Sequence, residues 1–421
     1  MKPEIKTRLA LIRNGEVPNG YKKTQLGIVP DNWNIVLLGD VFSERVERNR
    51  EDSPLLSITG TRGVIPRSEI AQKDSSSEDK SKYLRICNGD IGYNTMRMWQ
   101  GVSALSDHEG IVSPAYTILK PSSKICAKYF AYLFKTEPII FKFYRYSQGL
   151  VDDTRSLKFN SFSKIKITTP PLPEQKKIAS ILSAQDKVIE LCERKIEQLK
   201  RMKKYYLQNM FPKDGEEYPE IRFKGFTDAW EQRKLGELAD IIGGGTPSTS
   251  NNDYWDGDID WYAPAEIADQ IYVASSERKI TQQGYENSSA KMLPVGTVLF
   301  TSRAGIGKTA ILRKEGCTNQ GFQSIVPHEN LLDSYFIYSR TEELKRYGEI
   351  KGAGSTFVEV SGKQMASMEL MMPKTIEEQA QIGTYFRQLD HLITLHQRKC
   401  EEEKKKKKAL QQLLLTGLVR V

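Results

Sequence analysis

The sequence predicts a mixed α+β (α/β) protein made of two similar globular segments and two long helices. Each half of the chain ends in a long stretch with a coiled-coil pattern, and the second stretch repeats the first after 204 residues. Strand-like apolar segments precede each stretch, so each half reads as one repeating unit. We therefore expect a pseudo-twofold internal repeat, in which two long antiparallel coiled-coil helices separate two similar domains.

The first long helix is predicted within residues 170–212. Prolines at its start fix an extended approach, and Pro173 stands where a helix accepts proline as its first residue. Between Glu174 and Asn209 the chain has no proline or glycine, which allows about 54 Å of helix at roughly 1.5 Å per residue. Its mostly apolar seam recurs in steps of three and four residues. The candidates for the partner-helix interface on this stretch are Ile189, Cys192, Ile196 and Leu199.

The second long helix is predicted within residues 374–421, because the same pattern returns there. Gln175 of the first stretch is matched by Gln379, for example. Neither seam is apolar throughout, so we expect each helix to need the other. Globular segments at 1–169 and 213–373 complete the division of the chain. The interface candidates on the second stretch are Ile393, Cys400, Leu410 and Leu414.

The motif that opens the first helix resembles that of a known family. It reads Pro171-Leu172-Pro173-Glu174-Gln175, and a degenerate copy without the prolines, Thr375-Ile376-Glu377-Glu378-Gln379, opens the second helix. Such a motif before each of two long helices resembles the specificity subunit of type I restriction–modification enzymes. The resemblance covers nearly the whole chain.

This resemblance implies two target-recognition domains, each of which reads one half of a bipartite site on double-stranded DNA. It also implies that the long helices set the gap between the half-sites and dock two methyltransferase subunits. Separate motor–nuclease subunits would complete the complex. S-adenosylmethionine, ATP and Mg²⁺ would belong to these partner subunits, and this chain would hold no cofactor and no metal.

The composition agrees with a nucleic-acid partner in the cytoplasm. The 421 residues carry a formal net charge of +9, and a basic surplus suits a phosphate-rich ligand. The five cysteines are scattered and form no C-x-x-C pair, which predicts reduced thiols and no zinc site. We also expect no membrane segment, because no apolar run is long enough to span a bilayer.

A glycine turn, a strand and a polar exit with an arginine occur once in each half. The first copy spans 88–97 and ends in Arg97, and the second spans 294–303 and ends in Arg303. Arginine suits both phosphate and the edge of guanine, so matched arginines predict DNA contacts. A salt bridge that supports the loop is the alternative role. The DNA-contact candidates at these exits are Asn94, Thr95, Arg97, Thr301, Ser302 and Arg303.

The stretch 301–310, TSRAGIGKTA, is not a nucleotide-binding P-loop, because Ser302 stands where that motif needs its first glycine. The residues after Thr309 read as a strand and not as the helix that a P-loop requires. We predict a flexible basic loop between two strands, which brings Lys308 to a DNA phosphate.

An aromatic-rich helix and a polar glycine loop are predicted after the next strand of each half. The helices are expected at 126–146 and 331–347, with their aromatic side chains in the core and base stacking as the alternative. Trp33 and Trp230, near the start of each half, are likewise expected in the core. The loops add three further DNA-contact candidates: Arg155, Lys351 and Ser355.

The sequence shows no catalytic constellation. It lacks a glycine-rich methyl-donor site followed by an Asn/Asp-Pro-Pro-aromatic motif, and it has four histidines but no nucleophile motif. We therefore expect a non-catalytic recognition subunit, with methylation and cleavage carried out by partners. The alternatives are a two-domain DNA-processing enzyme of the nuclease type and a coiled-coil adaptor that does not bind DNA.

Overall fold

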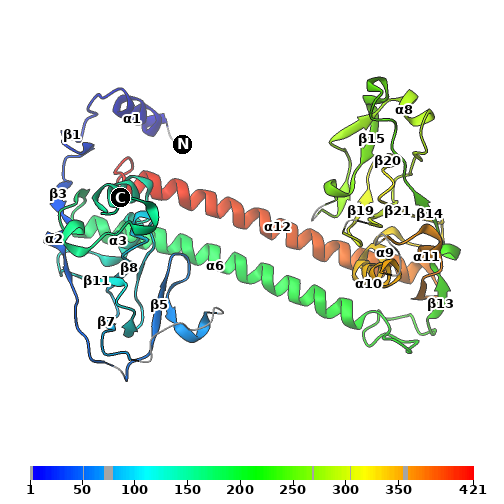
Figure 1. Ribbon diagram of the computed structural model, residues 1–421, viewed down its shortest axis with the longest axis horizontal. Coiled ribbons are helices and arrows are strands. Elements are labelled where there is room, and N and C mark those ends of the chain that lie inside the picture. Colours follow the sequence, from blue (N-terminus) through cyan, green and yellow to red (C-terminus); the bar gives the residue numbers. More distant parts are fainter. Residues whose placement is uncertain (1–2, 51, 71–78, 268–269, 304, 354–358) are drawn as a thin grey trace. The chain divides into compact units, whose positions relative to one another are not determined.

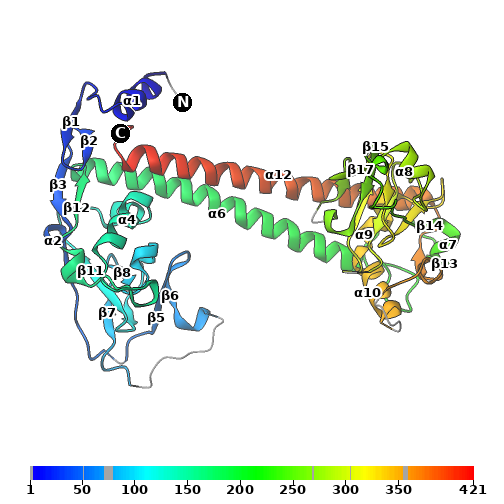
Figure 2. The ribbon, with the colours of Figure 1, turned by 45° about the horizontal axis from the view of Figure 1, so that its top comes forward.

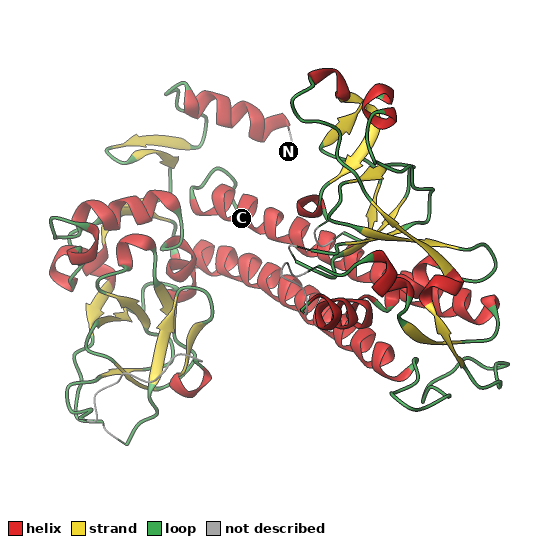
Figure 3. Ribbon diagram, turned by 45° about the vertical axis from the view of Figure 1, so that its right-hand side comes forward, coloured by secondary structure: helices red, strands yellow, loops and turns green. Residues whose placement is uncertain are grey.

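The computed structural model describes residues 3–50, 52–70, 79–267, 270–303, 305–353 and 359–421. Its contacts divide the chain into two compact units. Unit 1 comprises Met1–Cys192 with Lys399–Val421, and unit 2 comprises Glu193–Arg398. Both units mix helices with strands (Figure 3). The boundaries pass through both long helices, whereas the division read from the sequence kept the helices as separate segments.

The two long helices are α6 (Leu172–Asn209) and α12 (Ile376–Leu415), within the predicted stretches. They lie side by side in Figures 1 and 2. Because polar residues interrupt the apolar seam, side-chain ion pairs contribute to the pairing as well. The predicted interface residues are all buried or half-buried: Ile189, Cys192, Ile196, Leu199, Ile393, Cys400, Leu410 and Leu414.

The contacts within unit 2 show that α6 and α12 are antiparallel, as predicted. Lys203 of α6 contacts Asp390 of α12, with 2.7 Å between Nζ and Oδ1. Further along α6, the ring centroid of Tyr206 lies 5.2 Å from that of Tyr385, which precedes Asp390 in α12. As the residue number rises along α6, the number of the contacting residue in α12 thus falls.

A matched ion pair joins the two helices in unit 1. There Lys407 of α12 pairs with Asp186 of α6, at the same place in the repeat as the lysine–aspartate pair of unit 2. Each aspartate also accepts a hydrogen bond from a tyrosine of its own unit: Tyr132 Oη lies 2.5 Å from Asp186, and Tyr335 Oη lies 2.9 Å from Asp390. Burial raises the pKa of both tyrosines, so both hydroxyls keep the proton that they donate.

Unit 1 contains the helices α1 Pro3–Arg13, α2 Leu38–Val41, α3 Ala127–Leu133, α4 Glu137–Tyr146 and α5 Phe159–Phe162. Its strands are β1 Tyr21–Thr24, β2 Gly27–Pro30, β3 Asn34–Leu37, β4 Phe42–Glu44, β5 Leu56–Thr59, β6 Gly63–Pro66, β7 Leu84–Ile86, β8 Ile91–Asn94, β9 Ser103–Leu105, β10 Gly110–Val112, β11 Tyr116–Pro121 and β12 Lys166–Thr169. The central antiparallel sheet has the order β4-β11-β8-β9, and smaller sheets pair β1 with β2, β3 with β12, β5 with β6 and β7 with β10.

Unit 2 contains the helices α7 Leu235–Leu238, α8 Gln282–Glu286, α9 Ser334–Ser339, α10 Thr341–Gly352 and α11 Gly362–Ala366. Its strands are β13 Glu231–Lys234, β14 Ala239–Gly243, β15 Trp255–Tyr262, β16 Tyr272–Val273, β17 Arg278–Ile280, β18 Val298–Phe300, β19 Thr309–Leu312, β20 Cys317–Thr318, β21 Gln323–Pro327 and β22 Glu369–Met372. The main sheet has the order β14-β21-β18-β19-β16, and smaller sheets have the orders β17-β15-β20 and β13-β22.

The two units repeat the same core arrangement. In each unit, the strand after the buried tryptophan pairs with the strand that leads into the long helix: β3 with β12, and β13 with β22. The strand before the polar exit also keeps its partner, because β8 pairs with β11 and β18 with β21. Trp33 and Trp230 are buried, as predicted. The repeat in the sequence is therefore a repeat of structure.

The prediction of one aromatic helix in each half is wrong, because each is two helices. Pro138 near the start of α4 has no backbone N–H to donate, so the chain turns after α3 and begins a new helix. In unit 2 the break between α9 and α10 falls at Arg340. The buried Arg340 guanidinium donates a hydrogen bond to the backbone oxygen of Met371, 2.6 Å away.

A glutamine near the start of each long helix holds the preceding part of the chain. Gln175 accepts a hydrogen bond from the backbone N–H of Cys126, 2.9 Å away, and Gln379 accepts one from Asp333, 3.1 Å away. Cys126 and Asp333 are the residues before α3 and α9. The second copy of the motif has lost its prolines, but its glutamine still makes the matching contact.

The two ends of the chain meet in unit 1 (Figure 1). Arg8 of α1 donates a hydrogen bond to the backbone oxygen of Leu418, 2.9 Å away, and the Tyr21 hydroxyl donates to that of Gly417, 2.7 Å away. No helix in the described part of the chain is both long and apolar enough to cross a membrane.

Candidate functional site

The exits of β8 and β18 place an arginine at matching points of the two units. Arg97 is exposed and precedes the 3₁₀ helix Met98–Gln100. Arg303 is half-buried, and its backbone forms a β-bridge with Glu359. Among the described residues, neither guanidinium takes part in an ion pair or a side-chain hydrogen bond. Within that part of the chain, no salt bridge gives either side chain a supporting role.

Asn94 and Thr95 lie at the same exit and are half-buried. Asn94 accepts a hydrogen bond from the backbone N–H of Met96, 2.9 Å away, which shapes the turn before Arg97. The hydroxyl oxygen of Thr95 lies 3.4 Å from that of Thr117 on the neighbouring strand. Both residues thus contribute to the form of the exit that presents the arginine.

Thr301 and Ser302 are fully buried, so the structure corrects their prediction as DNA contacts. The Thr301 hydroxyl donates to the backbone oxygen of Gly305 and accepts from the backbone N–H of Lys308, at 2.7 and 2.9 Å. The backbone N–H of Ser302 donates to Gly321, 2.8 Å away, which keeps this residue inside the sheet. Thr301 therefore positions the loop that carries Lys308.

The loop between β18 and β19 joins two strands and is not a P-loop, as predicted. The two strands pair antiparallel, and no helix follows the turn directly. Gly307 has a φ of 95°, and a Cβ there would lie 2.3 Å from Lys345 Cγ, so the position requires glycine. Lys308 is exposed at the turn.

Arg155, another predicted DNA contact, is held against aromatic side chains within unit 1. Its Cζ lies 4.1 Å from the ring centroid of Tyr144 and 6.0 Å from that of Trp99. Its Nε also lies 3.4 Å from a carboxylate oxygen of Asp152. Arg155 thus fixes the loop after α4. The contact with Trp99 depends on the fold, because Trp99 is distant from Arg155 in sequence.

The other two loop candidates lie in unit 2. Lys351 is exposed near the end of α10, and its Nζ lies 5.7 Å from the ring centroid of Tyr347. Ser355 lies outside the described residues. Lys351 therefore remains a candidate for contact with phosphate.

The helix α4 divides its aromatic side chains between the core and the surface. Phe143 is buried, whereas Phe141, Tyr144 and Tyr146 are exposed. The predicted core role thus applies to Phe143 and not to the other three. The ring centroids of Tyr144 and Trp99 lie 6.3 Å apart, which places this exposed aromatic surface beside the exit of β8.

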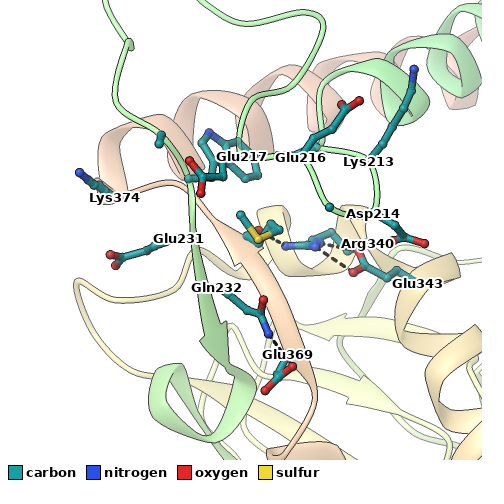
Figure 4. A pocket seen from close by; sticks show the side chains of 15 residues that line it. Lys213, Asp214, Glu216, Glu217, Glu231, Gln232, Arg340, Glu343, Glu369 and Lys374 are labelled. Carbon is teal, nitrogen blue, oxygen red and sulfur yellow. Dashed lines mark hydrogen bonds and ion pairs between the residues drawn. The ribbon is translucent and has the colours of Figure 1, made fainter.

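A cavity of ≈ 690 Å³ in unit 2 is lined by none of these candidates (Figure 4). Its lining carries more carboxylates than cations, and its Arg340 is already bonded to Glu343, with 2.7 Å between Nε and Oε2. A lining of this charge repels phosphate, so the cavity does not suit DNA. The charged residues that line it are Lys213, Asp214, Glu216, Glu217, Glu231, Arg340, Glu343, Glu369 and Lys374.

Two lysines neutralise the charge of Asp260 on the acidic strand β15 of unit 2. This buried carboxylate lies 2.6 Å from Lys314 Nζ and 3.2 Å from Lys279 Nζ. Burial would raise the pKa of Asp260, but hydrogen bonds from Lys314, Ser276 and Lys279 outweigh it and lower the pKa to about 2. Asp260 therefore stays ionised and holds the strand to its neighbours.

Comparison with known protein families matches most of the chain. The family model described as "Type I restriction modification DNA specificity domain" matches residues 30–201 and 227–404. The two matched segments follow the internal repeat, and each ends within a long helix.

Two similar proteins come from Methanocaldococcus jannaschii. The chain is 37% identical over 167 residues to the type I restriction enzyme MjaIX specificity subunit. This alignment covers 39% of this chain and 38% of that protein. The chain is 26% identical over 427 residues to the putative type I restriction enzyme MjaX specificity subunit. This second alignment covers 95% of this chain and 97% of that protein. The chain thus aligns with little more than a third of the first relative and nearly all of the second.

Two solved structures share the fold. One is a chain from a study of complex assembly and conformational transition of the type I R-M system, with a TM-score of 0.56, 18% identity, and coverage of 93% of this chain and 99% of that chain. The other is the S subunit of a type-I restriction-modification system from M. genitalium, with a TM-score of 0.53, 15% identity, and coverage of 93% and 96%.

Proposed function

Because the chain belongs to the type I restriction modification DNA specificity family, we propose that each of its units reads one half of a bipartite site on double-stranded DNA. The observation that supports this proposal is the matched pair Arg97 and Arg303, which leave the same strand of the repeat and form no ion pair among the described residues. An arginine can form two hydrogen bonds with a guanine in the major groove. The family match favours this function over a nuclease-type enzyme or an adaptor that does not bind DNA.

We propose further that α6 and α12 set the unread gap between the half-sites. Inserting one heptad after Cys192 and one after Arg398 adds about 10 Å to each helix, at roughly 1.5 Å per residue, and keeps the seam in phase. The double variant should recognise the same two half-sites with a longer gap. The measurement is sequencing of the methylated positions in DNA treated with this chain and its methyltransferase subunit.

The single insertion after Cys192 is the control, because it shifts one part of the seam against the other and should weaken recognition. An unchanged gap in the double variant would refute the role of the helices as a spacer. The absence of a bipartite methylated site with the original chain would refute the proposed function itself. Transfer of a methyl group by the chain alone would contradict the non-catalytic role that we assign to it.

The long helices also carry matched apolar residues on their exposed faces. Val188 and Leu191 of α6 recur as Leu392 and Leu395 of α12, and all four side chains are exposed. Exposed apolar residues at the same place in both repeats indicate two equivalent docking sites. We propose that each site takes one methyltransferase subunit, which brings S-adenosylmethionine. Separate motor–nuclease subunits would bring ATP and Mg²⁺.

A basic groove lies beside the docking residues of unit 1. Its volume is ≈ 370 Å³, and its three lysines are Lys128, Lys176 and Lys187. A positive groove is complementary to a negative partner surface, so we expect acidic side chains on the part of the methyltransferase subunit that meets α6.

Leu191→Asp and Leu395→Asp should each remove one of the two methyltransferase subunits, and the double variant should bind none. An aspartate in an apolar interface must lose its hydration without a partner charge, which lowers affinity by orders of magnitude. Native mass spectrometry of the reconstituted complex counts the subunits. Gln208→Asp adds the same charge at another exposed position of α6 and should keep both. Two bound subunits on the double variant would refute these docking sites.

A further inference from the structure

The loop after α4 in unit 1 ends in an apolar tip. The Leu150 side chain is 100% exposed, and that of its neighbour Val151 is 59% exposed. A single exposed leucine is ordinary on a protein surface. The preceding helix α4 also carries exposed aromatic side chains, those of Phe141 and Tyr146. Exposed apolar side chains on a loop and on the helix before it indicate a contact with another molecule.

The loop that carries Leu150 has a fixed shape. Gln148 and Ser156 exchange two backbone hydrogen bonds, of 2.8 and 2.7 Å, which close its base. Gly149 has a φ of 132°, and a Cβ there would lie 2.6 Å from the backbone oxygen of Thr154. The contacts of Arg155 with Tyr144 and Asp152 hold its far side. Leu150 is therefore presented to solvent by a closely packed loop, and its exposure does not arise from a missing contact at the base.

The base of this loop is joined to the exit of β8, which carries the arginine of unit 1. The backbone N–H of Leu157 donates to the oxygen of Thr95, 2.9 Å away, and so joins the base of the loop to the exit of β8. The exposed Arg97 follows Thr95 by two residues, and Arg145 is exposed on α4. A DNA duplex that Arg97 reads would thus pass close to the loop.

The charges of the loop decide which part of DNA the tip suits. Asp152 and Asp153 follow Val151 and are both exposed. Asp152 pairs with Arg155, whereas Asp153 forms no ion pair among the described residues, so the Asp153 carboxylate is repelled by the phosphate backbone. In the major groove, by contrast, a carboxylate can accept a hydrogen bond from cytosine, and an apolar side chain can contact the methyl group of thymine. The combination of apolar and acidic residues therefore favours base edges over phosphates.

We propose that Leu150 contacts the 5-methyl group of a thymine in the first half-site and is a specificity-determining residue there. This inference rests on the proposed function, because it requires unit 1 to bind a half-site in the major groove. It identifies the feature of the DNA that is read, a methyl group, and the side chain that reads it.

Deoxyuridine tests the proposal, because it removes only the methyl group of thymine. Each thymine of the mapped first half-site, on either strand, is replaced in turn, and affinity is measured by fluorescence anisotropy with the chain in complex with its methyltransferase subunit. The original chain should lose about fourfold in affinity at one position, the value expected for one buried methyl group. Leu150→Ala should bind the unmodified site more weakly and respond to no deoxyuridine.

Val46→Ala is the matched control, because Val46 is an apolar residue of unit 1 with 60% exposure that follows β4 and not α4. It should keep the full response to deoxyuridine. Specific binding without a response at any thymine would overturn the contact and leave the proposed function intact. The same would follow if Leu150→Ala kept the response, or if it lost the methyltransferase subunit and kept its DNA affinity. Failure of the original chain to bind the mapped site specifically would instead overturn the proposed function.

Discussion

Replacing Glu378 by alanine should lower the free energy of unfolding of unit 2 by about 3–5 kcal/mol. The Glu378 carboxylate is buried and accepts two hydrogen bonds from Arg222, at 2.7 and 2.8 Å, and one from the indole N–H of Trp230, at 3.3 Å. The Arg222 side chain is 14% exposed, so without its partner the guanidinium stays largely out of water. Removing one member of such a pair leaves a buried charge uncompensated.

Glu174→Ala is the matched comparison, because Glu174 holds the same position in the repeat of unit 1. Its partner Arg420 has a side chain that is 42% exposed and can turn to solvent when the carboxylate is removed. We therefore expect a loss of about 1 kcal/mol for this variant. Both losses of unfolding free energy are measured by hydrogen exchange of the whole chain in urea. The exchange is followed separately in peptides from unit 1 and from unit 2. Equal losses in the two variants would show that the depth of burial of the arginine does not set the cost.

The long helices and the internal repeat were predictable because their signals are periodic. A seam that recurs in steps of three and four residues marks a paired helix whatever surrounds it. The match of Gln175 with Gln379 likewise survives the loss of the prolines, since each glutamine holds the residue before the same helix of its unit. The break before α4 has a visible signal in Pro138, whereas the run of aromatic residues on both sides of it indicates a single helix.

The candidate site was predictable at its arginines but not in its supporting residues. A glycine turn and a strand with a polar exit identified Arg97 and Arg303, because these features are local. The burial of Thr301 depends on neighbours that the fold brings from elsewhere in the chain. In the sequence alone, a polar threonine near an arginine indicates a contact with DNA. The pair of Arg222 with Glu378 joins residues 156 positions apart, and no sequence pattern announces it.

Arg303→Ala should relax specificity at one position of the second half-site and cost about 1–3 kcal/mol of binding free energy. Arg97→Ala should do the same for the first half-site only, because each arginine belongs to a different unit. Lys308→Ala is the comparison in unit 2. A lysine on phosphate gives no base preference, so this variant should weaken binding to all sequences alike and lower the salt slope by about one. The measurement is affinity against a panel of single-base substitutions at several salt concentrations.

Arg303→Lys separates reading of a base from attraction to phosphate. Lysine keeps the positive charge but loses the planar pair of donors that matches guanine, so the variant should bind DNA non-specifically about as well as the original chain and lose the base preference. If Arg303 instead supported its loop, both Arg303→Ala and Arg303→Lys would lower the melting temperature, and the base preference would remain. Because the Thr301 hydroxyl already closes that loop through Gly305 and Lys308, we expect the melting temperature to stay unchanged and the base preference to be lost.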